Sequence, residues 1–189
     1  MRTVPGTALD RLLTLSLAGS LGLTLVSSVL YALLGWDSPP AAVAHILGGA
    51  LGGLLVVRVA TWLDGLAPAV LLIGMLGVAG NVGYGFNTIT VGLGGLDLID
   101  ASGAAAILKV LGLLWPLTLL LAGIGLWNRV PRWCAIGIVL GAVAFPVSRI
   151  ANIGWLAVVV DLVLLGCLVA APSVLRGVGS AQPDPARVA

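Results

Sequence analysis

The chain has 189 residues, of which 60% are hydrophobic and only 8% are charged, a composition that excludes a water-soluble fold. The formal net charge of +2 is too small to indicate a nucleic-acid partner, and the signatures of common metal, nucleotide and hydrolase sites are missing. We therefore predict no metal, no cofactor and no nucleic acid. A membrane-spanning helix needs about 20 apolar residues, so the chain has room for about six spans with short connections.

The predicted fold is an all-α, polytopic integral membrane helix bundle, multi-pass in the cell membrane and surrounded by the lipid bilayer. We expect the bundle over residues 1–176 and a disordered cytoplasmic tail, which contains two prolines, over 177–189. The expected spans are six hydrophobic segments, at residues 12–34, 41–62, 66–84, 103–127, 133–148 and 153–175. The N-terminal segment also resembles a signal peptide, but its apolar stretch is about twice the usual length, so we expect it to remain as the first span.

Positive charges predict the orientation, because Lys and Arg are retained on the cytoplasmic side of a membrane. If both termini are cytoplasmic, only Lys109 and Arg149 lie toward the outer side. The other bases then lie at or beyond cytoplasmic helix ends: Arg2, Arg11, Arg58, Arg129, Arg132, Arg176 and Arg187. The sequence therefore predicts an N-in, C-in topology.

The connection at residues 85–102 is apolar for a loop and contains Asp97 and Asp100. We expect it to lie on the outer membrane surface, and the alternative is a re-entrant path that covers a pocket. Asp100 or Ser102 is expected to cap the span that follows.

Small residues form faces on several spans. Gly48 and Gly52 lie four positions apart on the second span, and Gly137 and Gly141 do so on the fifth, so that a neighbouring backbone can approach closely. These faces predict tight packing within the bundle, and the sharper alternative is a homo-oligomer that forms through them. A further row winds around the third span at Gly74, Gly77, Gly80 and Gly83. The two cysteines, Cys134 and Cys167, are expected to be packing residues.

Polar side chains at membrane depth are the candidate binding residues, because an ionisable group there costs roughly 2.5–3.5 kcal/mol on insertion scales. Under the predicted topology nearly all of them fall in the outer half of the bundle. The candidates for substrate binding are His45, Asn81, Tyr84, Lys109, Arg149, Asn152 and Asp161.

Asp161 is the deepest of these residues, about 13 Å from the outer end of its helix, and Lys109 lies about 9 Å in. A lysine side chain can span that difference. Arg149 would be about 18 Å from Asp161 along one continuous helix. We therefore predict an ion pair between Lys109 and Asp161, which either sets the helix register or belongs to a polar pocket.

Three functions remain open on the sequence. The first is a small transporter or ligand-binding protein, with a small-molecule or lipid ligand at the outer polar cluster. The second is a membrane-embedded enzyme that acts on a lipid or isoprenoid, with Asp161 or His45 as acid or base in a laterally open cleft. The third is a non-catalytic interaction subunit of a larger membrane complex, which needs an exposed groove and no cavity.

Overall fold

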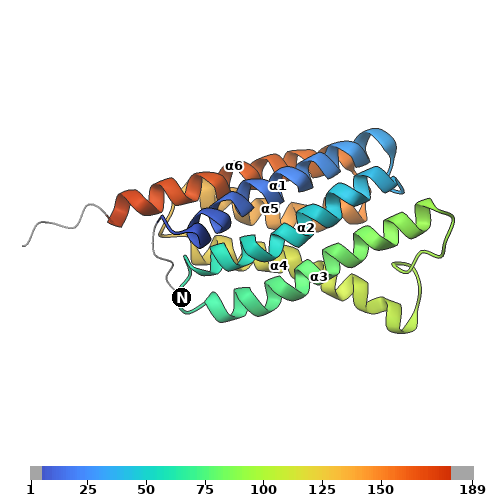
Figure 1. The fold of residues 1–189 in the computed structure, drawn as a ribbon, viewed down its shortest axis with the longest axis horizontal. Coiled ribbons are helices and arrows are strands. Elements are labelled where there is room, and N and C mark those ends of the chain that lie inside the picture. Colours follow the sequence, from blue (N-terminus) through green and yellow to red (C-terminus); the bar gives the residue numbers. More distant parts are fainter. Residues whose placement is uncertain (1–5, 180–189) are drawn as a thin grey trace, which may run out of the picture.

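The computed structural model describes residues 6–179, with the backbone alone for 172–179. The described residues form six α-helices and one 3₁₀ helix, without strands: α1 (Ala8–Leu34), α2 (Pro39–Ala60), α3 (Ala67–Gly92), η1 (Gly103–Ala106), α4 (Ile107–Gly125), α5 (Arg132–Ile150) and α6 (Gly154–Gly179) (Figure 1). Six spans are long and apolar enough to cross a membrane, with η1 and α4 together forming the fourth. The predicted all-α membrane bundle of six helices is therefore confirmed.

The helices run alternately in opposite directions, and each packs against the next in the chain. α6 also packs against α1, which closes the six helices into a ring. The start of α1, the end of α6 and the connections 61–66 and 126–131 lie at one end of the bundle, which we call the terminal end (Figure 1). The opposite end, which we call the distal end, carries the connections 35–38, 93–102 and 151–153.

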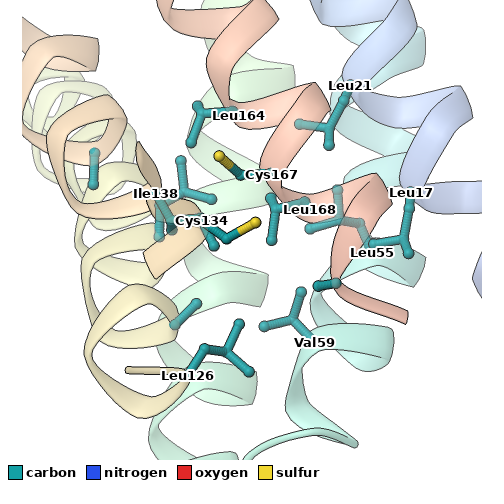
Figure 2. Packing of buried hydrophobic residues seen from close by; sticks show 14 of the residues in the cluster. Leu17, Leu21, Leu55, Val59, Leu126, Cys134, Ile138, Leu164, Cys167 and Leu168 are labelled. Atoms are coloured by element: carbon teal, nitrogen blue, oxygen red, sulfur yellow. The ribbon is translucent and has the colours of Figure 1, made fainter. Parts of the chain in front are cut away.

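The apolar core fills the half of the bundle nearer the terminal end. The core there includes residues of α1, α2 and α6 and of the connection that follows α4: Leu17, Leu55, Val59, Leu126 and Leu168 (Figure 2). Cys134 and Cys167 lie in the same cluster as buried free thiols, in the packing role expected of them. This half of the bundle is therefore built mainly by apolar packing.

The helix ends differ from the sequence prediction in two places. The third span was expected to end at Tyr84 and this is wrong, because α3 continues to Gly92. Gly85 is a packing residue and not a helix breaker, since a Cβ on it would collide with Ile46 of α2. At the other end of the chain, α6 continues through Gly179, past the expected end of the membrane domain, and residues 180–189 lie outside the described part.

The small-residue faces contact helices of the same chain. A Cβ on Gly48 would press on Ser20 and Thr24 of α1, and one on Gly141 would press on Leu164 of α6. Gly52 faces α1, α3 and α4, and Gly137 faces α6. These contacts are the packing role expected of small residues. A homo-oligomer through the same faces stays a prediction from the sequence alone.

Glycines also bring α3 and α4 into direct backbone contact. A Cβ on Gly77 or Gly80 would lie less than 3.0 Å from backbone atoms of α4, at Trp115 and Leu111 respectively. Gly83 continues the row toward the distal end and faces Leu108. The glycines wind around α3, as expected from their spacing. They still contact α4, because the two helices cross at an oblique angle (Figure 1).

Candidate functional site

A cavity of about 510 Å³ lies at the distal end, between α2, α3, α4 and α5. Its walls include connection 93–102, which contributes Asp97, Ile99 and Asp100. Gly112 of α4 lies on the cavity wall, and a Cβ added to it would have no atom within 4 Å. Figure 1 shows the two helices diverging toward this end. The glycine contact near mid-membrane and the divergence beyond it therefore create the space.

Two prolines on the walls change the backbone of their helices. Pro116 in α4 and Pro146 in α5 both line the cavity. Proline has no N–H, so the carbonyl four residues earlier loses its helical hydrogen bond. For Pro116 that carbonyl belongs to Gly112, which also lines the cavity. The Gly112 carbonyl therefore lacks the usual helical donor at residue 116.

The predicted ion pair between Lys109 and Asp161 is wrong. Asp161 pairs with Arg149 instead, with 3.3 Å between Nη2 of the arginine and Oδ2 of the aspartate. Ser28 of α1 donates a short hydrogen bond to the same Oδ2, and Arg149 donates to the Ser28 hydroxyl at 2.7 Å. The prediction failed because it measured the separation along one helix, whereas α5 and α6 are separate antiparallel helices joined at 151–153. Arg149 therefore reaches across to Asp161 from the neighbouring helix.

Lys109 pairs with Asp100 of the connection that precedes its own helix, at 3.4 Å from Nζ to Oδ1. Both side chains are largely exposed, at 53% and 82%. Such a pair contributes about 1 kcal/mol or less. Lys109 lines the cavity at its rim without closing it.

Arg149 lines the cavity and has buried donors without a partner in the described part of the chain. Its guanidinium lies over the rings of Trp36 and Phe145, at 5.5 and 5.1 Å from the ring centroids. Nη2 is occupied by Ser28 and Asp161, whereas the buried Nε and Nη1 have no hydrogen-bond partner among the described residues. The guanidinium thus lies close to two aromatic rings, and two of its nitrogens are buried without a described partner.

His45 is the second buried group without a partner. It is 4% exposed, and neither ring nitrogen has a hydrogen bond of normal geometry within residues 6–179, although Asn81 is a polar neighbour of the ring. Its ring lies 6.2 Å from that of Tyr31 and 5.6 Å from that of Tyr84. His45 lines the cavity together with Asn81, and both also border a smaller space of about 10 Å³ deeper in the bundle. The imidazole therefore lies at the inner end of the cavity.

The remaining candidates take different positions. Tyr84 lines the cavity from α3. Asn81 also lines it, and its Nδ2 donates to the Gly77 carbonyl at 3.0 Å. Asn152 adopts a positive φ of 54° in the α5–α6 turn, where its carbonyl accepts from Trp36 Nε1 at 2.9 Å. The structure thus brings His45, Asn81, Tyr84, Lys109, Arg149 and Asn152 to one cavity, with Asp161 behind Arg149. Their role in binding stays a prediction.

The sequence analysis missed the residues that fix the connection over the cavity. Asn87 donates from Nδ2 to Asp97 Oδ1 at 2.8 Å, and its Oδ1 accepts from the backbone N–H of Leu98 at 2.7 Å. Asp97 Oδ1 also accepts from the N–H of Ile99. Ser102, proposed as a helix cap, makes no capping hydrogen bond through its side chain. Asn87 was overlooked because it was assigned to a loop, although it lies on the last turns of α3.

Comparisons with family models, with curated proteins and with solved structures found no match to this chain.

Proposed function

We propose that this protein binds a small polar molecule in the distal cavity, as a transporter or ligand-binding protein of the membrane. The observation that carries the proposal is the cavity itself, whose volume of about 510 Å³ lies in the range of small-molecule sites. Its rim includes the exposed residues Asp37, Asp100 and Asn152, so the ligand enters from the distal side.

The unpartnered nitrogens of Arg149 and His45 support this proposal. Buried polar groups are nearly always hydrogen-bonded, and an unsatisfied one costs about 1–3 kcal/mol. Both side chains line the same cavity, and they come from different helices, α5 and α2. The nitrogens themselves are buried in this conformation. A ligand with hydrogen-bonding atoms would satisfy them after a shift of the two side chains, which gives the cavity a role beyond packing.

The other two functions have less support. An enzyme with Asp161 as its acid or base would need that carboxylate at the cavity, but the walls of the cavity do not include Asp161, and Ser28 and Arg149 occupy its Oδ2. The enzyme alternative therefore depends on His45, which lines the cavity as a single candidate acid or base. An interaction subunit would need no cavity, and its small-residue faces are already in contact with helices of the same chain.

The proposal can be tested by thermal unfolding of the purified protein with a panel of small amines, acids and neutral polar compounds. We expect at least one compound to raise the unfolding temperature of the wild-type protein. Gly112→Leu should abolish that shift, because the new side chain extends into the cavity without a clash at its Cβ. Gly22→Leu is the matched control, since its Cβ is equally unobstructed but Gly22 does not line the cavity.

A shift that survives in Gly22→Leu and disappears in Gly112→Leu supports binding in the cavity. The proposal is wrong if no compound stabilises the protein, or if every stabilising compound acts equally on both variants.

A further inference from the structure

We infer that the ligand of the distal cavity is an organic cation, a small amine that also carries an oxygen acceptor. This inference rests on the proposed function and adds the chemical class of the ligand.

The balance of charge on the cavity walls favours a cation. Three carboxylates line the cavity, those of Asp37, Asp97 and Asp100, against the two bases Lys109 and Arg149. Lys109 pairs with Asp100, and Arg149 pairs with Asp161 behind the wall. Asp37 and Asp97 are left without an ion pair in the described part of the chain. At the mouth of a low-dielectric cavity, uncompensated carboxylates attract cations and repel anions.

Asp97 is held in place for this role. It is half-buried, and its Oδ1 accepts from Asn87 and from the Ile99 backbone, so the carboxylate is fixed on the cavity wall. Its second oxygen, Oδ2, has no hydrogen bond among residues 6–179. The carboxylate is thus pre-oriented with one oxygen available, the arrangement that binds an ammonium group at little cost in side-chain entropy.

Two further groups on the same side of the cavity suit an ammonium group. The Gly112 carbonyl lacks its helical donor because of Pro116, so it can accept from an N–H. The ring of Tyr84 also lines the cavity, and an aromatic face attracts a cation within about 6 Å. Together with Asp97, these groups give the walls formed by α3, α4 and connection 93–102 an acceptor character.

The wall formed by α2 and α5 has the opposite character. Nε–H and Nη1–H of Arg149 and one N–H of neutral His45 are buried behind this wall without a partner among the described residues, and a shift of the two side chains brings them to a ligand. Because Asp161 already compensates the guanidinium charge, these donors suit a hydroxyl or carbonyl oxygen and do not require an anion. A ligand that satisfies both walls therefore carries a cationic amine at one end and an oxygen acceptor at the other.

The sign of the cavity potential can be measured without knowing the natural ligand. Gly112→Cys places a thiol on the cavity wall, while the native Cys134 and Cys167 are buried elsewhere. The probes are the trimethylammonium-ethyl and sulfonato-ethyl methanethiosulfonates, which are cationic and anionic. We expect the ratio of cationic to anionic labelling rates to exceed that for free 2-mercaptoethanol by ~10-fold.

Two variants shift that ratio in opposite directions. Asp97→Asn should lower it, because the amide oxygen keeps the hydrogen bonds and the charge is lost. Lys109→Met should raise it, because Asp100 loses its counter-ion. Asp64→Asn, which removes a carboxylate from the terminal end, should leave the ratio unchanged.

Protection by three matched compounds then tests the ligand class. Phenylalaninol should slow labelling of Gly112→Cys at concentrations at least ~10-fold lower than 3-phenylpropan-1-ol, which lacks the amine, or 3-phenylpropanoate. Faster labelling by the anionic reagent, or better protection by 3-phenylpropanoate, overturns the cation inference. Either result would still agree with a ligand site in the cavity. If neither reagent labels the thiol and none of the three compounds stabilises the wild-type protein, both the cation inference and the proposed function are overturned.

Discussion

Arg149 connects the interior of the bundle to the cavity. Its Nη2 forms an ion pair with Asp161, which is 1% exposed. Its guanidinium also lies over the rings of Trp36 and Phe145. A buried pair of this kind gives little net stability over an apolar replacement, but loss of one partner strands a charge in a medium that solvates it poorly. Arg149 and Asp161 should therefore be strongly coupled.

We predict that Arg149→Met and Asp161→Leu each destabilise the protein by about 3 kcal/mol, and that the double variant loses no more than either single one. The measurement is a double-mutant cycle by thermal unfolding in one detergent. The exposed pair of Lys109 and Asp100 is the control, and its coupling should be below about 1 kcal/mol. Strictly additive losses for the buried pair would rule out the coupling.

The sequence analysis selected polar residues that the structure brings to one cavity, but it assigned the wrong partner to Asp161. The cost of polar groups at membrane depth was enough to select the residues that line the cavity, such as His45 and Arg149. The partner of Asp161 could not be predicted, because it depends on how α5 and α6 face each other across their turn. The depth of a residue along its own helix axis does not show which residue of the neighbouring helix it faces.

The α3–α4 pair is the element on which the cavity depends. Close backbone contact at Gly77 and Gly80 allows the helices to cross, and Gly112, next to the Gly80 contact, lines the cavity. The sequence showed the glycine row but not its partner helix. It also placed the end of α3 too early, because a glycine such as Gly85 serves equally as a helix breaker and as a packing residue.

We predict opposite effects for two glycine-to-alanine changes on these helices. Gly80→Ala should destabilise the protein by about 1–3 kcal/mol, since its Cβ would collide with the backbone of α4. Gly112→Ala should be neutral or stabilise by up to about 1 kcal/mol, because it gains helix propensity and meets no neighbour. Thermal unfolding compares the two directly. Equal, small effects would mean that α3 and α4 are not in backbone contact.

At the scale of the whole molecule, the two ends of the bundle carry different sets of charged side chains. The terminal end carries the pairs of Arg58 with Asp10 and of Arg129 with Asp64. The distal end carries Lys109 and Arg149 around the cavity. The number and order of the spans could be predicted from hydropathy, whereas the closure of α6 on α1 could not, because apolar faces do not specify which neighbour they meet.

The excess of arginine at the terminal end supports our proposal that both termini are cytoplasmic and that the cavity opens to the outside. A cysteine at Ser102, in the distal connection, should react with an impermeant thiol reagent in intact cells. A cysteine at Gly65, in the connection 61–66, should react only after the cells are opened. Both sites are exposed, and the native cysteines are buried. The reverse pattern would invert the orientation and place the cavity on the cytoplasmic side.

The most direct measurement of the central claim is the position of a bound compound. We would determine the cryo-EM structure of the protein in a nanodisc, with a rigid antibody fragment and the compound that stabilises it most. We expect density in the distal cavity, with an acceptor atom about 3 Å from a nitrogen of Arg149 or His45. A compound bound on the lipid-facing surface, with these nitrogens hydrogen-bonded to other protein groups, would contradict a ligand site at the distal end.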